Sequence, residues 1–246
     1  MNHTAIADNL TQYQGDIQYL RQNYPNVTYV LGETNSDYVN TNMWAIEGVF
    51  GSALWMVDYL MFGMTQNITR MHLIQGTNFG YTAWVPVESN GRAPYVRPPL
   101  FGLLFHADVI GRSPEIQVQE VSLNQWDFSA YAVYNTGKLA KYVVVNLDEW
   151  NSTTPYARPQ KTVTITAPSS SGIHCQHGGM VAKVQRLTAG GASADSGITW
   201  GGLTWNYTDG RLAQEGRPAA ETIVFDAQGR ADLTIASSEA VLVTFL

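Results

Sequence analysis

Cysteine is almost absent from this chain of 246 residues. Cys175 is the only one, which excludes an internal disulfide framework and a zinc site built from cysteines. Charged residues make up only 14 % of the chain, and 14 basic against 20 acidic side chains give a net charge of −6. This balance gives no excess of positive charge of the kind that binds nucleic acid. The longest apolar run, residues 49–57, is far short of the roughly 20 residues that cross a bilayer. We therefore expect no nucleic-acid partner and no membrane insertion.

The composition is that of a globular protein, with 45 % hydrophobic and 11 % aromatic residues, enough for one large domain or two ordinary ones. Residues 1–8 lack the positive charge and apolar stretch of a signal peptide. Sequons of the form Asn-x-Ser/Thr are nevertheless frequent, against about two expected by chance, and begin at Asn2, Asn9, Asn26, Asn67, Asn151 and Asn206. Together these features predict a secreted, glycosylated protein of which the N-terminal part is missing here.

The first part of the chain alternates between helical and strand patterns. Apolar residues recur every three or four positions over residues 4–22, which predicts a helix. Residues 27–31 are almost wholly apolar, a pattern typical of a strand buried on both faces of a parallel sheet. A helix at 44–64, a strand at 70–76 and a helix at 100–110 follow. Two strands and three helices correspond to only the last units of a (β/α)8 barrel.

Beyond residue 111 the pattern changes to a period of two, with turn signals between short segments. Hairpins are predicted over 131–146 and 221–235, and further strands over 161–166, 181–187, 198–206 and 240–245. Many short antiparallel strands predict a β-sandwich. The fold class we expect is therefore α/β plus all-β, with an α/β domain over residues 1–112 and a C-terminal antiparallel β-sandwich over 113–246.

Glu33 is the candidate for catalysis because of its place in the chain. Reactive groups of parallel α/β barrels lie at the C-terminal ends of strands, and Glu33 directly follows the predicted buried strand. Thr34, Asn35 and Ser36 are short polar neighbours, which we expect to donate hydrogen bonds to the carboxylate and keep it ionised. From position alone, a structural salt bridge remains the alternative interpretation.

Three segments resemble a known family: Val30-Leu31-Gly32-Glu33-Thr34-Asn35-Ser36, Ala53-Leu54-Trp55-Met56-Val57-Asp58-Tyr59-Leu60 and Gln75-Gly76-Thr77-Asn78-Phe79-Gly80-Tyr81. They are similar to segments of the fungal β-glucuronidase-like enzymes of glycoside hydrolase family 79, to which heparanase also belongs. The resemblance continues through Tyr95-Val96-Arg97-Pro98 and into residues 130–146. It implies the C-terminal portion of a retaining glycosidase with a (β/α)8 barrel and a C-terminal β domain.

The resemblance also implies roles for single residues. Glu33 matches the family's nucleophile, and Tyr38 and Tyr81 match tyrosines that bind the carboxylate of a uronic acid. Backbone amides near Val39 and Asn40 are implied to assist, and Asn35 belongs to the same motif. The implied substrate is a glycan with β-linked glucuronic acid or its 4-O-methyl form, and no cofactor is implied.

One departure from the family is large. Retaining hydrolysis needs two carboxyl groups about 5 Å apart. The family's proton donor is a glutamate that follows an asparagine, and no Asn-Glu dipeptide occurs in this chain. Glu47 and Asp58 are poor substitutes, because they belong to an apolar helix and not to a strand end. Two alternatives to an enzyme therefore stay open: a non-catalytic glycan-binding or interaction module, and a fragment that acts after pairing with a separate N-terminal segment.

Two further features are weak indications of a metal site and of a sugar-binding residue. His174, Cys175 and His177 cluster in a Gly/Ser-rich stretch without a second ligand pair at zinc spacing, so we expect a surface loop and no metal site. Trp84 is a candidate sugar-stacking platform, although packing in the core is an equally good interpretation.

Overall fold

The computed structural model describes residues 1–37, 43–89, 91–168 and 179–246. Its N-terminal helical stretch consists of α1 (His3–Thr11) and α2 (Gln14–Asn23), where the sequence predicted one helix. The break has a local cause, because the Thr11 hydroxyl and the Gln12 side-chain amide donate to carbonyls of the last turn of α1. Ile6, Leu10 and Ile17 keep the predicted apolar stripe and are buried.

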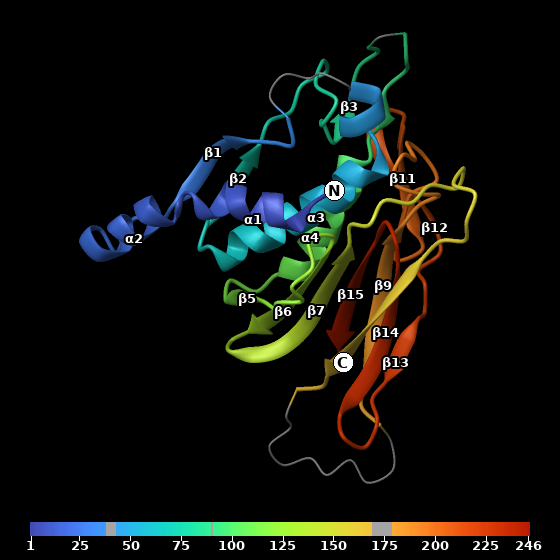
Figure 1. Ribbon diagram of the computed structural model, residues 1–246. Helices are drawn as coiled ribbons and strands as arrows, with labels where there is room; N and C mark the ends of the chain where they lie inside the picture. Colours follow the sequence, from blue (N-terminus) through green and yellow to red (C-terminus); the bar gives the residue numbers. More distant parts are fainter. Residues whose placement is uncertain (38–42, 90, 169–178) are drawn as a thin grey trace.

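A single βαβ unit follows these helices (Figure 1). Strand β1 (Val30–Thr34) pairs in parallel with β2 (Arg70–Leu73), in a register that places Leu31 opposite Met71. The connection contains η1 (Met43–Glu47), a single π-helical turn, and α3 (Phe50–Thr65). After β2 comes the small antiparallel pair of β3 (Trp84–Val85) and β4 (Tyr95–Val96), and then α4 (Pro99–Ile110).

The position and burial of β1 differ from the prediction. The strand begins three residues later than expected and contains Glu33, which was predicted to follow it. It is also not buried on both faces, since Val30 is 36 % exposed and Leu31 is the only buried residue in the strand. The reason is the lack of neighbours: in the described part of the chain, β1 and β2 pair only with each other.

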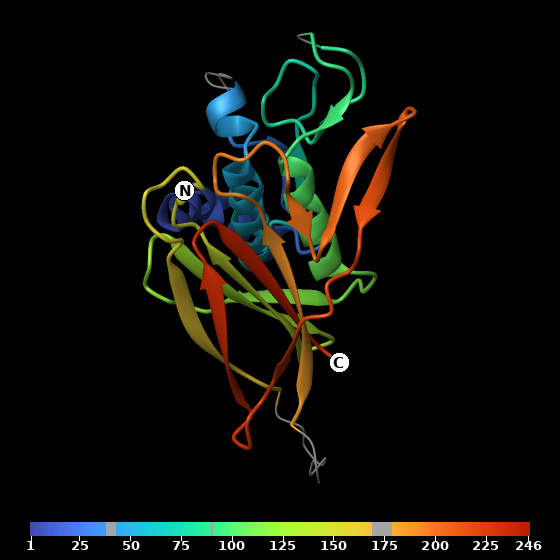
Figure 2. The same cartoon turned by 90° about the vertical axis from the view of Figure 1, so that its right-hand side faces the viewer.

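The remainder of the described chain is a β domain (Figures 1 and 2). Its strands are β5 (Ile116–Glu120), β6 (Phe128–Asn135), β7 (Lys138–Asn146), β8 (Gln160–Thr166), β9 (Val181–Thr188), β10 (Thr199–Trp200), β11 (Leu203–Thr208), β12 (Arg211–Gly216), β13 (Thr222–Val224), β14 (Arg230–Ala236) and β15 (Glu239–Phe245). In the described residues the main sheet has the order β12-β11-β10-β9-β15-β7-β6-β5, with β13 attached to β9, while β8 and β14 form a separate antiparallel pair. The predicted β-sandwich is confirmed.

One of the two predicted hairpins is wrong. Strands β6 and β7 form the first, around Thr136 and Gly137, which both adopt positive φ. The second turn exists, because Asp226 accepts hydrogen bonds from the backbone of Gln228 and Arg230. The strands on its two sides, however, do not pair with each other: β13 joins β9 and β14 joins β8. The turn therefore crosses between the two layers of the sandwich.

The central strands β7 and β15 of the main sheet have buried residues on both faces, which divides the core into two clusters. Alternate residues along β7 and β15 face opposite sides, so Val143 and Leu242 join one cluster, while Val144 and Val241 join the other. The first cluster also contains α1, α3 and α4 residues, and the second fills the space toward β8 and β14. The helical part and the β domain thus share the first of these two clusters.

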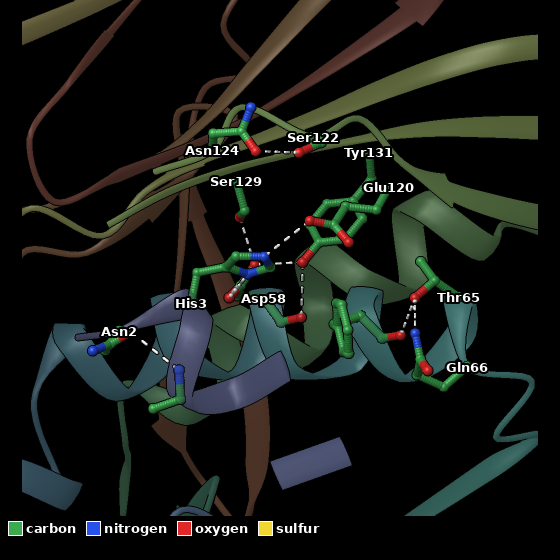
Figure 3. Close-up of polar contacts among 12 residues, drawn as sticks. Asn2, His3, Asp58, Thr65, Gln66, Glu120, Ser122, Asn124, Ser129 and Tyr131 are labelled. Atoms are coloured by element: carbon green, nitrogen blue, oxygen red, sulfur yellow. Dashed lines mark hydrogen bonds and ion pairs between the residues drawn. The ribbon is translucent and has the colours of Figure 1, made fainter. Parts of the chain in front are cut away.

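A buried polar cluster lies where α1, α3 and the β domain meet (Figure 3). The Asp58 side chain is fully buried. One of its carboxylate oxygens lies 2.9 Å from Nδ1 of His3. The other accepts hydrogen bonds from the hydroxyls of Ser129 and Tyr131, both at 2.5 Å. His3 Nε2 lies 3.1 Å from Glu120. Burial alone lowers the pKa of His3, but the hydrogen bonds and charges of Asp58 and Glu120 outweigh it and raise that pKa above 6.5.

The raised pKa of His3 predicts a pH-dependent stability. A group whose pKa is raised by folding stabilises fully below its unfolded pKa, and this contribution disappears as pH rises through the folded value. We expect His3→Gln to lower the free energy of unfolding by about 2 kcal/mol at pH 6 and by clearly less at pH 8.5. Urea unfolding at both pH values measures this. The matched control is His72→Gln, at an exposed position of β2. Equal losses at the two pH values would contradict a protonated His3.

Candidate active site

An open pocket of about 670 Å³ lies at the C-terminal ends of β1 and β2. This is the end at which parallel α/β units carry their functional groups. The pocket is lined by residues of β1 and the segment after it, of α1 and α3, and of the segment after β2: Asn2, Ala5, Ile6, Asn9, Tyr13, Glu33, Thr34, Asn35, Ser36, Asp37, Trp55, Tyr59, Ile74, Phe79 and Tyr81. Glu33, Asn35 and Tyr81, which the sequence suggested, thus border one cavity.

Glu33 is the next-to-last residue of β1 and is exposed in the pocket. Among the described residues, no hydrogen bond or ion pair to its carboxylate is present. Its three neighbours were expected to donate to it, and for Thr34 and Asn35 this prediction is wrong, because the Thr34 hydroxyl pairs with the Tyr59 hydroxyl and the Asn35 amide donates to the Ile74 carbonyl. The Glu33 carboxylate is therefore exposed and makes no hydrogen bond to another described residue.

Thr34 and Asn35 instead tie the end of β1 to its surroundings. The Thr34 hydroxyl lies 2.6 Å from the hydroxyl of Tyr59 on α3. The Asn35 side-chain amide donates to the carbonyl of Ile74, at the end of β2, while its oxygen accepts from the backbone N–H of Ser36. These bonds fix the backbone on the C-terminal side of Glu33 and so position the carboxylate.

Two aromatic residues of α3 form one wall of the pocket. Trp55 and Tyr59 are four residues apart on the helix, and their rings stack with centroids 4.5 Å apart. Burial raises the pKa of Tyr59, although the bond with Thr34 works against this effect, so its hydroxyl stays protonated at neutral pH. The sequence analysis gave neither residue a role, although their i, i+4 spacing and their place in the family-like segment were visible.

Tyr81 also lines the pocket. Its side chain is only 3 % exposed, and its ring stacks on Phe79 at 5.2 Å with nearly parallel planes. Burial raises the pKa of Tyr81, and the negative charges of Glu47, Asp37 and Glu33 raise it further. A tyrosine in this state is a neutral hydrogen-bond donor throughout the physiological pH range.

Arg97 holds the segment that carries Tyr81. Its side chain is 1 % exposed, and one guanidinium nitrogen donates to the carbonyls of Phe79 and Gly80 at 3.0 and 2.8 Å. The other two nitrogens donate to the hydroxyl of Tyr95. The planar guanidinium of a buried arginine can clamp several groups at once. Several hydrogen-bond acceptors are needed to offset the free-energy cost of burying its charge. The sequence analysis missed it because its partners lie up to 18 residues away.

Two carboxylates considered as substitute acids have separate locations. Asp58 belongs to the buried cluster with His3. Glu47 is 2 % exposed and lines a neighbouring cavity of about 480 Å³, which shares Ser36, Asp37 and Trp55 with the pocket of Glu33. Glu47 is thus closer to the candidate site than its place in an apolar helix indicated.

Several predicted residues lie elsewhere or outside the described part of the chain. Tyr38, Val39 and Asn40 fall within residues 38–42, and His174, Cys175 and His177 within 169–178, all outside it. Trp84 is 39 % exposed and does not line the pocket. Among the described residues, no group of three histidine, cysteine or acidic side chains is arranged to hold a metal ion. No helix in the described part is long and apolar enough to cross a membrane.

Comparison with known proteins agrees with this architecture. Residues 130–242 match the model of the glycosyl hydrolase family 79 C-terminal beta domain. A β-glucuronidase of Aspergillus niger is 34 % identical over 227 residues, which are 89 % of this chain and 40 % of that protein. A β-glucuronidase of Neurospora crassa is 29 % identical over 203 residues, 72 % of this chain and 36 % of that protein. The chain therefore spans two fifths or less of the length of these relatives.

The fold of nearly the whole chain also occurs in a solved structure. A 4-O-α-L-rhamnosyl-β-D-glucuronidase from Fusarium oxysporum 12S superposes with a TM-score of 0.78 at 24 % identity, over 99 % of this chain and 48 % of the other. The likenesses place the chain in the lineage of the glycoside hydrolases. Within that class, residues 130–242 match the C-terminal β domain of family 79, and 89 % of the chain aligns with a β-glucuronidase at 34 % identity.

The clamp formed by Arg97 predicts a stability effect. Arg97→Lys keeps the positive charge but cannot reach Phe79, Gly80 and Tyr95 together. We expect it to lower the free energy of unfolding by about 2–4 kcal/mol, measured by urea unfolding. Arg21→Lys, at an exposed position of α2, is the matched control and is expected to cost less than about 0.5 kcal/mol. Similar stabilities of the two variants would rule out a clamp.

Proposed function

We propose that this chain supplies the nucleophile side of a retaining β-glucuronidase, with Glu33 attacking the anomeric carbon of a β-linked glucuronic acid. The observation that carries the proposal is the position of Glu33 at the C-terminal end of β1, in a pocket that also contains Tyr81. The 34 % identity to a β-glucuronidase over 89 % of the chain supports the same reaction class. In a retaining mechanism the product of this attack is a covalent glycosyl ester, which water then hydrolyses.

We further propose that residues 1–112 are the last units of a (β/α)8 barrel. The parallel pairing of β1 and β2 and the helices that follow each strand support this assignment. So does the exposure of Val30 on β1, since a strand of a closed barrel has neighbours on both sides. The partner of this chain is then a segment that carries the other barrel strands, whether on the same polypeptide or on a separate one.

The second carboxyl group of the reaction is proposed to come from that segment. Of the carboxylates in the described chain, only Asp37 lines the pocket together with Glu33. No Asn-Glu dipeptide of the kind expected for the family's proton donor occurs in the sequence. This chain alone would then be able to expel only leaving groups that need no proton.

We assign the selection of glucuronic acid to uncharged hydrogen-bond donors that bind its carboxylate. The hydroxyl of Tyr81, kept protonated by its raised pKa, would donate to the substrate carboxylate, with Tyr38 and the amides near Val39 and Asn40 completing the set. Because Glu33, Asp37 and Glu47 make the surroundings negative, the substrate's charge has to be compensated by several hydrogen bonds. A donor set of this kind favours a carboxylate over the hydroxymethyl group of a neutral hexose.

A non-catalytic role as a glycan-binding module is the second candidate. The observation that favours it is the exposed carboxylate of Glu33, which has no hydrogen-bond partner among the described residues, beside a β domain with a hydrophobic core of its own. Covalent labelling separates the two, because binding alone forms no ester at Glu33.

Secretion and N-glycosylation remain part of the proposal. Five of the six sequon asparagines are exposed: Asn2, Asn9, Asn26, Asn67 and Asn206. Asn151 is half-buried, and its side-chain oxygen accepts hydrogen bonds from the backbone and the hydroxyl of Ser193. We therefore assign glycosylation to Asn26 and Asn67, because Asn2, Asn9 and Asn206 line cavities that the proposed functions use.

Covalent trapping tests the nucleophile. The reagent 2-deoxy-2-fluoro-β-glucuronyl fluoride carries a leaving group that departs without a proton, and its 2-fluorine slows hydrolysis of the ester. We expect one equivalent of label on the peptide that contains Glu33, detected by mass spectrometry, and none with Glu33→Gln. The corresponding glucosyl fluoride, which lacks the carboxylate, is the matched reagent control and should label far more slowly. Labelling at another carboxylate would refute the assignment.

Leaving-group dependence tests the missing proton donor. General acid catalysis contributes about 10²- to 10⁴-fold. We expect the chain to cleave 2,4-dinitrophenyl β-glucuronide, and to cleave the 4-methylumbelliferyl glucuronide slower by about that factor. Azide, a nucleophile that needs no general base, should accelerate turnover of the dinitrophenyl compound and yield β-glucuronyl azide. Equal rates on both substrates without an azide effect would mean that a working acid/base is already present in this chain.

A further inference from the structure

A second groove, of about 520 Å³, lies between the helical part and the β domain. One side is the segment 92–98, which carries β4 and leads into α4, and the other is strand β11 together with residues 195–198. In Figure 2 the orange hairpin of β11 and β12 rises beside the green segment that carries β4. The groove is formed jointly by the two parts of the chain.

Aromatic side chains form both walls of this groove. Trp205 and Tyr207 are two residues apart on β11 and therefore point to the same side of the strand. That side faces the helical part, since Trp205 packs edge-on against Phe101 of α4 at 5.9 Å. Tyr95 lines the other wall. Flat aromatic faces are the surfaces on which the C–H faces of sugar rings pack.

The aromatic walls are held in place before any ligand arrives. The hydroxyl of Tyr95 accepts two hydrogen bonds from the Arg97 clamp, whose guanidinium carbon lies 5.3 Å from the centre of the Tyr95 ring. Trp205 is half-buried against the main core. A preorganised aromatic groove loses less side-chain entropy on binding than a flexible one.

Polar groups at the rim fit the hydroxyls of a glycan. The exposed side chains of Arg92, Asp195, Ser196 and Asn206 line the groove, and they comprise hydrogen-bond donors and acceptors. Arg92 is the one cation among the lining residues, and its guanidinium carbon lies 5.8 Å from the centre of the Tyr95 ring. A densely sulfated chain would need a cluster of cations. The groove chemistry therefore fits neutral or weakly acidic sugars.

The groove and the pocket of Glu33 are supported by the same segment and by the same buried arginine. The segment between β2 and α4 lines both, with Phe79 and Tyr81 in the pocket and Tyr95 in the groove. Arg97 binds the backbone of Phe79 and Gly80 and the hydroxyl of Tyr95 at the same time. One buried side chain thus supports a wall of each cavity.

From this geometry we propose that the groove lined by Tyr95, Trp205 and Tyr207 binds the glycan chain to which the glucuronic acid is attached. The proposal rests on the function assigned to Glu33, and it adds a substrate class: an unsulfated oligosaccharide that reaches the β domain. The β domain then contributes directly to substrate binding, through β11.

The test is a calorimetric titration of the full chain, produced in a host that does not N-glycosylate because Asn206 is a sequon. The probes are D-glucuronic acid and two tetrasaccharides that end in β-linked glucuronic acid, one from hyaluronan and one built on galactose. We expect at least one tetrasaccharide to bind at least 10-fold more tightly than the monosaccharide. Tyr207→Ala should remove this advantage and leave the affinity for glucuronic acid within twofold. Tyr156→Ala, at an aromatic that is 58 % exposed and outside the groove, is the matched control.

The outcomes separate the groove from the function of Glu33. If both tetrasaccharides bind no more tightly than glucuronic acid, or if Tyr207→Ala equals Tyr156→Ala, the groove proposal is overturned. Tighter binding of a heparin tetrasaccharide than of the unsulfated probes would also overturn it. If the tetrasaccharides bind in a Tyr207-dependent manner but glucuronic acid does not bind, the groove is upheld as a glycan site and the proposed function of Glu33 fails. Retained circular dichroism of Tyr207→Ala excludes unfolding as the cause.

Discussion

The fully buried carboxylate of Asp58 is the constraint on which the arrangement of this chain depends. A charge without access to water is tolerable only when hydrogen bonds replace its hydration, and here His3, Ser129 and Tyr131 provide them. These partners come from α1 and from β6, two elements that meet at the Asp58 side of α3. Rotation or sliding of α3 would break several charge-assisted hydrogen bonds at once. Apolar packing around α3 is non-directional and does not select one rotation in this way.

The same constraint reaches the candidate active site through one step of the helix. Tyr59 follows Asp58 directly, and successive residues of an α-helix point about 100° apart. With Asp58 fixed toward the β domain, Tyr59 and its stacked neighbour Trp55 face the pocket, where Tyr59 bonds to Thr34 beside Glu33. The β domain thus orients the pocket, although the described pocket residues come from the helical part. This coupling gives a physical reason for the two parts to share one core.

The sequence predicted the elements whose signal is local, and failed where distant partners decide. Periodicity and turn residues located α4 and the β6–β7 hairpin within a few residues. The turn at Asp226 was also visible, but the separation of β13 and β14 into different layers depends on β9 and β8, which the local pattern does not reveal. Arg97 also depends on residues distant in the sequence. An arginine is expected at the surface, and the acceptors that make its burial possible cannot be identified from the local sequence. The place of Glu33 near the end of β1 was predictable, because a strand end is marked by local sequence.

The exposure of Glu33 bears on how such a site gains its reactivity. A carboxylate surrounded by water is stabilised by hydration and is a weak nucleophile, and a dry, preorganised environment replaces that hydration with fixed dipoles. Thr34 and Asn35 bond to Tyr59 and Ile74, so the described chain fixes the backbone beside Glu33 but gives its carboxylate no hydrogen bond. The remaining barrel strands, in the assembly we propose, would close the open edge beside β1 and exclude water from the pocket. In that proposed assembly, closure of the barrel would contribute the second carboxyl group and the desolvation of the first in a single structural step, whereas the backbone beside Glu33 is already held by the bonds to Tyr59 and Ile74.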